Sequence, residues 1–230
     1  KQRRKRASTI PSDERDLAKD FGESISFDHL ILGGVKRVNG AKVALHVSDE
    51  ASDFWGIFPA KTKSAPDVEV ALRHFIGDNT EQVKELYPDN AKEFQKVALR
   101  LRLARENSTP RRPTSNARQE RKHQTHCDST AAVLSQGCRP VSLWPLAGEY
   151  VALVRNITGD ENSPYYKRYG ELPVAKFYPL GAKVTVVSSQ GCRSKGPRAL
   201  EGVFLGYSLG PGNKFHGGHI ASPVDDFTQG

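Results

Sequence analysis

The fold is constrained most by a switch in hydrophobic period along the chain. Apolar and polar residues alternate in three successive segments, 24–32, 41–49 and 53–61, and such alternation predicts β-strands. In the next segment, 64–76, apolar residues recur at helical spacing, with Pro66 in the first turn and a glycine directly after the last. Because the connections between the strands are short, we expect an antiparallel meander followed by a helix.

A second alternation of strand and helix comes next. We expect a short strand at 82–88, a helix at 91–107, a loop at 108–117 that contains two prolines, and a helix at 118–136. A strand that follows a crossover helix can return to the sheet parallel to an earlier strand. The predicted order favours an α/β fold, with a mixed sheet flanked by helices.

Two further patterns describe the middle of the chain. The helix predicted at 118–136 carries Cys127, Ala131 and Leu134 along one stripe, as in an amphipathic helix. The segment 143–157 predicts one more helix, which would cover the core.

Composition and pattern together divide the chain into four regions. They are a basic flexible arm at 1–20, a core at 21–157, a linker at 158–176 and a small β module at 177–230. The last region is rich in glycine and carries short strand-like segments, among them 183–187 and 202–208.

The charge of the chain favours a polyanionic partner. The net charge is +8, and most of the surplus lies between Arg100 and Lys122, where eight Lys or Arg residues stand against two acids. The opening KQRRKR is a second basic cluster, which could be a nuclear-import signal, a nucleic-acid arm or a solvated tail.

The three cysteines and the hydropathy pattern indicate the type of cellular compartment in which we expect the chain. The cysteines are odd in number and no two have zinc-type spacing, which favours a reducing compartment over a disulfide framework. No apolar run approaches the length of a membrane span and no signal peptide is visible, so we expect a soluble, intracellular protein. The first residue is Lys rather than Met, which suggests a piece of a longer chain.

Three acidic residues fall where chemistry could use them. Asp28 lies within the first predicted strand, Asp89 follows the fourth, and Glu120 opens the helix after the loop. If the fourth strand lies parallel beside the first, Asp28 and Asp89 become neighbours. Carboxylates brought together repel one another unless a cation neutralises them, and Mg²⁺ prefers such oxygen ligands. The alternative is three ordinary surface acids, of which Asp89 forms a turn.

The segments around these acids resemble a known family. "ISFDHL", "LYPDNAKEF" and "STPRRPTSNARQERK" are similar to the three signature blocks of the retroviral-type integrase core, in the copia-type LTR-retrotransposon Pol lineage. Downstream, "GCRPVSLWPLA", "SPYYKRYGELP" and "EGVFLGYS" resemble, in the same order, a helix, a linker and a β module of that family.

The resemblance implies a fold and a chemistry. The core would be an RNase H-like mixed sheet, followed by an SH3-like module, and Asp28, Asp89 and Glu120 would hold Mg²⁺ or Mn²⁺, as two ions. These would trim a DNA 3′ end and transfer it into target DNA. A homo-oligomer would act in the nucleus, after a cytoplasmic particle stage. The residues expected to contact DNA phosphates are Arg111, Arg112, Arg118, Arg121 and Lys122.

Departures from the family pattern keep two alternatives open. Ala91 and Ala117 stand where the family has glycine, and Asp89 and Glu120 lie closer in sequence than is usual there. One alternative is a catalytically decayed domain that only binds nucleic acid. The other is an RNase H-like nuclease or transposase that cuts without joining ends.

The histidines and tryptophans are expected to have structural roles. His123, His126 and Cys127 lie together in one predicted helix but lack a fourth zinc ligand at suitable spacing. We therefore interpret the two histidines as packing or solvent-facing residues, and Trp55 and Trp144 as anchors of the core or of a hinge.

Overall fold

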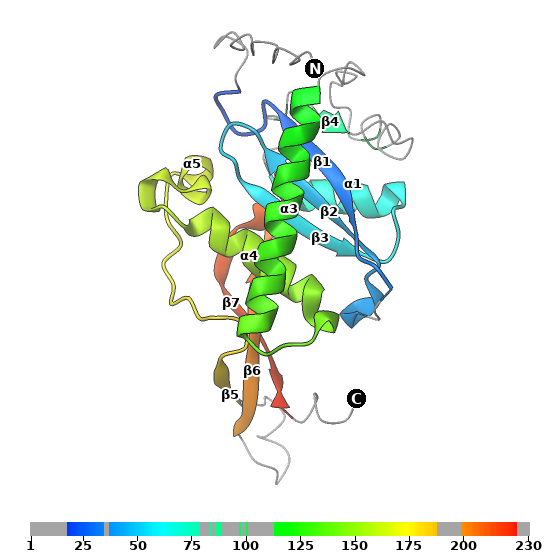
Figure 1. The fold of residues 1–230 in the computed structure, drawn as a ribbon. Helices are drawn as coiled ribbons and strands as arrows, with labels where there is room; N and C mark the ends of the chain where they lie inside the picture. The colour runs from blue at the N-terminus through cyan, green and yellow to red at the C-terminus, as the bar shows by residue number, and fades with distance from the viewer. Residues whose placement is uncertain are drawn as a thin grey trace, which may run out of the picture.

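The structure of the chain is a computed structural model (Figure 1). The structure describes residues 18–34, 37–78, 83, 86–88, 97, 100, 113–187 and 199–224, without the side chains of 87, 88 and 113–118. The predicted arm at 1–20 and the helix predicted at 91–107 fall largely outside these residues. Within that helix, Val97 and Arg100 are described, and both are helical.

The main sheet has four strands in the order β3-β2-β1-β4. The strands are β1 (Ile25–Ile31), β2 (Val43–Asp49), β3 (Trp55–Ala60) and β4 (Leu86–Pro88). The β1–β2 and β2–β3 pairs are antiparallel, whereas β4 pairs with β1 in parallel. The predicted meander, the parallel return and the mixed α/β class are confirmed.

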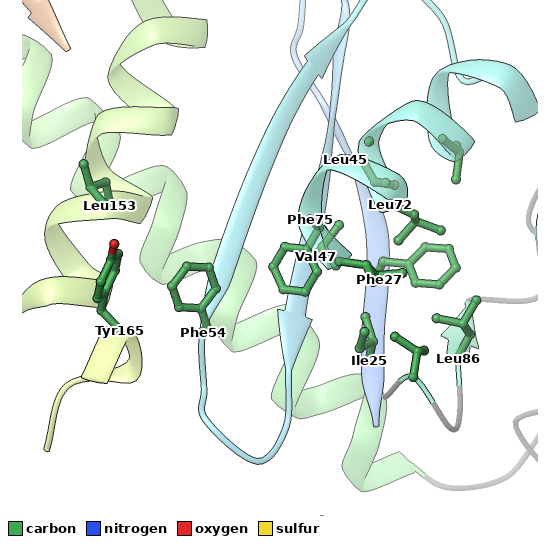
Figure 2. Packing of buried hydrophobic residues seen from close by; sticks show 14 of the residues in the cluster. Ile25, Phe27, Leu45, Val47, Phe54, Leu72, Phe75, Leu86, Leu153 and Tyr165 are labelled. Carbon is green, nitrogen blue, oxygen red and sulfur yellow. The ribbon is translucent and has the colours of Figure 1, made fainter. Parts of the chain in front are cut away.

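Helix α1 (Ala65–Ile76) covers one face of this sheet. Ser64 caps its first turn by accepting a hydrogen bond from the Asp67 N–H, and Gly77 ends it with φ 66°, a conformation that favours glycine. The apolar face of α1 packs on the apolar face of the strands (Figure 2). The fully buried members of this core include Ile25, Phe27, Val47, Leu72, Phe75 and Leu86. Burial of each contributes about 1.5–3 kcal/mol.

Helix α3 (Pro113–Gln136) crosses the opposite face of the sheet (Figure 1). The loop predicted at 108–117 is therefore wrong from Pro113 onward. Proline is tolerated in the first turn, because the N–H that it lacks has no helical partner there. Glu120 consequently lies well inside the helix and does not open it.

The stripe predicted along α3 is also partly wrong. Leu134 is buried and Cys127 is half-buried, but Ala131 is exposed. The most buried line, at intervals of four, instead runs through polar side chains, namely Lys122, His126 and Thr130, before it reaches Leu134. Polar residues at helical spacing give no hydrophobic signal, so the apolar pattern located the wrong face.

Helix α4 (Trp144–Ile157), preceded by the 3-10 turn η4 (Val141–Leu143), packs against both β3 and the C-terminal sheet. The side chain of Asn156 accepts from the Trp55 N–H and donates to the Trp55 carbonyl, at 2.9 and 2.7 Å. Trp55 and Trp144 are 3% and 8% exposed, which confirms their interpretation as core residues.

The segment predicted as a linker contains regular structure. A 3-10 turn, η5 (Asp160–Asn162), leads into the short helix α5 (Pro164–Tyr169), which Ser163 caps at its start. Gly170 ends this helix in the left-handed conformation, and Tyr165 is buried.

A separate three-stranded antiparallel sheet, in the order β5-β6-β7, lies toward the C-terminus. Its elements are β5 (Lys183–Val187), β6 (Ala199–Leu209), the turn η7 (Pro211–Asn213) and β7 (Phe215–Pro223). Phe204, Tyr207 and Phe215 join the same hydrophobic cluster as β1 and β2. The two sheets are thus separate in hydrogen bonding but share one core. In the described part of the chain, no helix is long and apolar enough to cross a membrane.

Candidate functional site

The site lies between the main sheet and α3, on side chains that point away from the hydrophobic core. Alternation along β1 turns Ile25 and Phe27 into the core. The intervening residues Ser26 and Asp28 meet α3, through Gln119 and His123 respectively. The strand period alone therefore places Asp28 on the face that α3 covers.

Asp28 occupies the middle of β1, where it pairs across the ladder with His46 of β2. Its Oδ1 accepts a hydrogen bond from the His29 N–H at 2.7 Å, and its Oδ2 lies 3.8 Å from Nδ1 of His123. The side chain is 36% exposed, so this carboxylate is reached from solvent as well as from the helix.

The parallel pairing of β4 with β1 bears on the second predicted acid. The last paired residues are Phe27 and Pro88, which directly precede Asp28 and Asp89 in the sequence. Asp89 itself lies outside the described residues, so its predicted role stays a prediction.

Glu120 is an exposed residue of α3, three positions before His123 and hence on the same side of the helix. Burial lowers the pKa of His123 to about 4, with Lys122 acting in the same direction, while the nearby Glu120 opposes the shift. The ring is therefore neutral at pH 7, and its contact with Asp28 is not an ion pair. Asp28 thus contacts this imidazole from β1, and Glu120 on α3 is near enough to act on its pKa.

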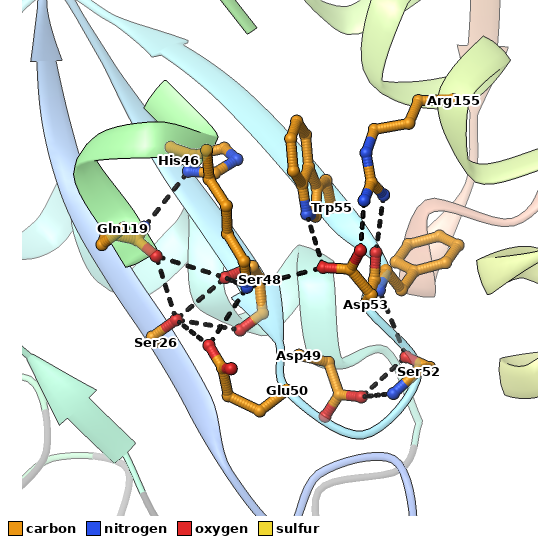
Figure 3. A network of polar contacts seen from close by, with 12 residues as sticks. Ser26, His46, Ser48, Asp49, Glu50, Ser52, Asp53, Trp55, Gln119 and Arg155 are labelled. Atoms are coloured by element: carbon orange, nitrogen blue, oxygen red, sulfur yellow. Dashed lines mark hydrogen bonds and ion pairs between the residues drawn. The ribbon is translucent and has the colours of Figure 1, made fainter. Parts of the chain in front are cut away.

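Gln119 orients two histidine rings around this point, of which Figure 3 shows that of His46. Its Nε2 lies 3.2 Å from both Nδ1 of His46 and Nε2 of His123. Its Oε1 accepts from the Ser26 hydroxyl at 3.3 Å. With the amide as donor, each neutral ring carries its proton on the other nitrogen. His123 then presents Nδ1–H toward Asp28, and Nε2 of His46 has no hydrogen-bond partner among the described residues.

His46 joins His123 and His126 in a group of rings, a member that the sequence analysis did not single out. His46 is 0% exposed, and its ring centroid lies 4.9 Å from that of His123 and 6.0 Å from that of His126. Burial lowers the pKa of His126 to about 4 and holds that of His46 well below its usual value. Two sequence patterns taken together could have found the group. His46 alternates with apolar residues on β2, and Gln119, His123 and His126 recur at helical spacing.

Lys122, one of the predicted DNA contacts, points inward. It is 9% exposed, and its Nζ lies 3.1 Å from Oε1 of Glu50 and 3.5 Å from Oδ1 of Asp53. It also donates to the Ser48 hydroxyl at 3.1 Å, and Asp53 in turn pairs with Arg155 of α4. An ammonium held in this way is not presented to a phosphate. It instead ties α3 to the turn between β2 and β3.

The other predicted DNA contacts are described unevenly. Arg121 is exposed on α3 directly after Glu120. Arg118 lies in the same helix, but its side chain is not among those described, and Arg111 and Arg112 lie outside the described residues.

The carboxylate oxygens predicted for this site are ligands of the type that a hard divalent cation prefers. Mg²⁺ binds through one or two carboxylates together with water and substrate phosphates. Of the two predicted carboxylates described, Asp28 contacts the neutral His123 ring and Glu120 acts electrostatically on it. Within the described ranges, no group of three or more His, Cys, Asp or Glu side chains is placed to hold a metal. The third predicted ligand, Asp89, belongs to the part of the chain outside those ranges.

Of the comparisons with known proteins, the one with solved structures found similar chains. No protein-family model and no curated protein matches the chain. Among solved structures, the chain is similar to the catalytic core domain of BIV integrase, at 19% sequence identity and a TM-score of 0.45. The similarity covers 63% of this chain and 91% of that domain. It concerns the arrangement of helices and strands, not the chemistry of either chain.

Proposed function

We propose that this chain is the catalytic core of an integrase of the copia-type LTR-retrotransposon lineage, followed by an SH3-like module. Its reaction would be metal-dependent polynucleotidyl transfer, in which a DNA 3′ end is trimmed and then joined to target DNA. The proposal rests on the sequence blocks around Asp28, Asp89 and Glu120 and on the arrangement of β1, β4 and α3.

The observation that carries the proposal is the parallel pairing of β1 with β4. The two strands run side by side as far as the residues that directly precede Asp28 and Asp89. On the same face of the sheet, Glu120 lies close enough to His123 to influence its pKa, and His123 contacts Asp28. Asp28 and Glu120, distant in sequence, thus lie on one strand and one helix at the same face of the sheet, and Asp89 directly follows the adjacent strand in the sequence.

The residues of the chain would share the work as follows. Asp28, Asp89 and Glu120 would hold Mg²⁺ or Mn²⁺, as a pair of ions, which would activate the attacking hydroxyl and stabilise the leaving oxygen. Asp28 and Glu120 are both accessible from solvent, as a DNA phosphate requires. His123, oriented by Gln119, presents an N–H toward Asp28 and so helps to position this carboxylate.

DNA contact would come from the basic residues near the start of α3. Arg121 is exposed beside Glu120, and we propose that it acts together with Arg111, Arg112 and Arg118 on phosphates. Lys122 is left out of this set because Glu50 and Asp53 hold its ammonium. Two DNA ends would be joined by a homo-oligomer, which acts in the nucleus after a cytoplasmic particle stage.

A DNA-joining assay tests the proposal. The protein is incubated with a labelled DNA end, blunt in one reaction and already 3′-recessed in another, and a target duplex, in Mg²⁺ or Mn²⁺. We expect cut and joined products from the wild type, and a loss of at least about 100-fold in Asp28→Asn, Asp89→Asn and Glu120→Gln. Glu161→Gln is the matched control, since it neutralises an exposed acid on η5 and should leave both products unchanged. Cutting without joining would favour a nuclease.

A second candidate is a catalytically decayed domain that only binds nucleic acid. The observation that favours it is the His123 ring, which lies beside Asp28 where a cation and its water would need space. In that case the wild type gives no product in the same assay, but still retards labelled DNA in a gel. His123→Asn separates the two candidates further, because it removes bulk beside Asp28 and would restore activity only if the ring blocks the site.

A further inference from the structure

A cavity of about 550 Å³ lies on the other side of the molecule from α3's polar face. It forms where the outer edge of β3 meets α1, α4 and the C-terminal sheet. Apolar side chains make most of its wall, among them Leu45, Ile57, Phe58, Leu153 and Leu209. The proposed catalytic acids Asp28 and Glu120 take no part in it.

Glu149 of α4 is the acid that distinguishes this cavity. It also lines a neighbouring cavity of about 260 Å³, together with Lys61, Pro59 and Ala60, and so lies where the two meet. The side chain is half-buried, and no hydrogen bond or ion pair from the described residues reaches its carboxyl group. Burial raises the pKa of Glu149 to about 7. Among the described residues, the Glu149 carboxyl group therefore has neither a cation nor a hydrogen-bond donor to offset its burial.

The other ionisable groups around the cavity do not supply that partner. Asp67 accepts a hydrogen bond from the Thr62 hydroxyl at the start of α1. Burial lowers the pKa of His74, whose ring packs on Phe58, so it is neutral at pH 7. His29 lines the wall from β1, and Lys61 is exposed at the rim. The raised pKa of Glu149 is caused by burial, and Lys61 does not counteract it.

The edge of β3 adds backbone polarity to the apolar wall. Hydrogen bonding between β2 and β3 pairs Phe54 with Asp49, and the alternation of the ladder turns the N–H and C=O groups of Trp55 and Ile57 outward. Asn156 takes those of Trp55. Those of Ile57 face the edge at which Ile57 lines the cavity.

We propose that this cavity binds a small organic cation, with an ammonium group on Glu149 and an apolar body against Ile57, Phe58 and Leu153. The size of the cavity suits such a ligand, since small-molecule sites span roughly 300–1,000 Å³ with few polar groups in an apolar wall. The ammonium group would donate to the carboxylate and offset the burial of its charge. This site is independent of the proposed DNA chemistry.

The test is a titration followed by ¹H–¹⁵N NMR, with benzylamine in its protonated form as the probe and benzyl alcohol as its neutral counterpart. At pH 8 we expect saturating shifts confined to amides that line the cavity, such as those of Ile57 and Phe58, and at least about tenfold weaker binding of the alcohol. Glu149→Gln should reduce benzylamine binding to the level of the alcohol, whereas Glu161→Gln should bind as the wild type does. Equal binding of both probes, or an unchanged Glu149→Gln, would overturn the proposal.

A second measurement needs no variant. Because Glu149 titrates near pH 7, the affinity of the wild type for protonated benzylamine should fall about tenfold between pH 8 and pH 6. Affinity for benzyl alcohol should stay constant over the same range. An affinity for benzylamine that does not change with pH would contradict a role for this carboxylate. None of these outcomes depends on activity toward DNA.

Discussion

The two faces of the main sheet use the same strands in opposite ways. Toward α1, β1 and β2 present Ile25, Phe27 and Val47, which are at most 2% exposed and belong to one hydrophobic cluster. Toward α3, the same strands present Ser26 and Asp28 among histidines, a glutamine and a lysine. The first face stabilises the fold through apolar burial, and the second is held by hydrogen bonds that also orient ionisable groups.

This difference explains why the sequence predicted the apolar face toward α1 but not the polar face toward α3. Apolar burial is non-directional, so hydrophobic period alone predicts it. A polar interior depends on which partner reaches which atom, and that follows from tertiary contacts between residues as distant as Ser26 and Gln119. Three experiments distinguish the contributions of the two faces, and they follow in order of decreasing expected effect.

Truncation on the α1 face should have the largest effect. Phe75→Ala removes a fully buried ring, and we expect it to lower the free energy of unfolding by about 3–5 kcal/mol. Val70→Ala, at a 68% exposed position of the same helix, should change it by less than about 0.5 kcal/mol. Urea denaturation measures both. Similar values for the two would mean that α1 is not packed on the sheet as described.

Acidification should next distinguish the α3 face. His123 and His126 have folded pKa values of about 4, below their unfolded values, so their contribution is present above pH 6.5 and is lost as the pH falls toward 4. Between pH 7 and pH 5 the two together should lower the free energy of unfolding by about 3 kcal/mol.

Glu149 acts in the opposite direction and must be removed from that measurement. Its folded pKa of about 7 lies above the usual value, so its contribution is present at low pH and is lost as the pH rises toward 7. Urea denaturation at both pH values is therefore done in Glu149→Gln, with and without His126→Gln. An equal loss of stability in both backgrounds would mean that His126 is not buried as a neutral ring.

The smallest effect compares two adjacent basic residues of α3. Lys122→Met should lower the free energy of unfolding by about 1–2 kcal/mol, since Glu50 and Asp53 lose a partly buried partner. Its DNA affinity should change little. Arg121→Ala, at an exposed position, should change the free energy of unfolding by less than about 1 kcal/mol and reduce the salt slope of DNA binding by about 1. The reverse pattern would place Lys122, and not Arg121, on the DNA-facing side.

Much of the fold could be predicted from local pattern. The meander, α1 with its Ser64 cap and Gly77 stop, and the parallel return of β4 all follow from period and punctuation. The start of α3 was missed because prolines were interpreted as a loop, although Pro113 occupies the first helical position. The shared core of the two sheets was missed because contacts such as those of Phe204 and Phe215 have no local signal.

The candidate site was predictable in part. Strand alternation correctly turned Asp28 away from the apolar core, and the motif resemblance selected Glu120. The inward path of Lys122 was not predictable, because a charged residue on a helix is more often exposed. The burial of His46 could have been inferred only by combining its position among apolar residues of β2 with the helical spacing of Gln119, His123 and His126.

We propose that Asp28 on β1 and Glu120 on α3 hold the same cation. Mn²⁺ binding measured by electron paramagnetic resonance tests it directly, since the free ion gives a signal that is lost on binding. We predict that Asp28→Asn and Glu120→Gln each weaken Mn²⁺ binding by at least about tenfold, while Glu161→Gln binds as the wild type does. Wild-type protein that binds no Mn²⁺, or binding that survives both substitutions, would contradict the claim.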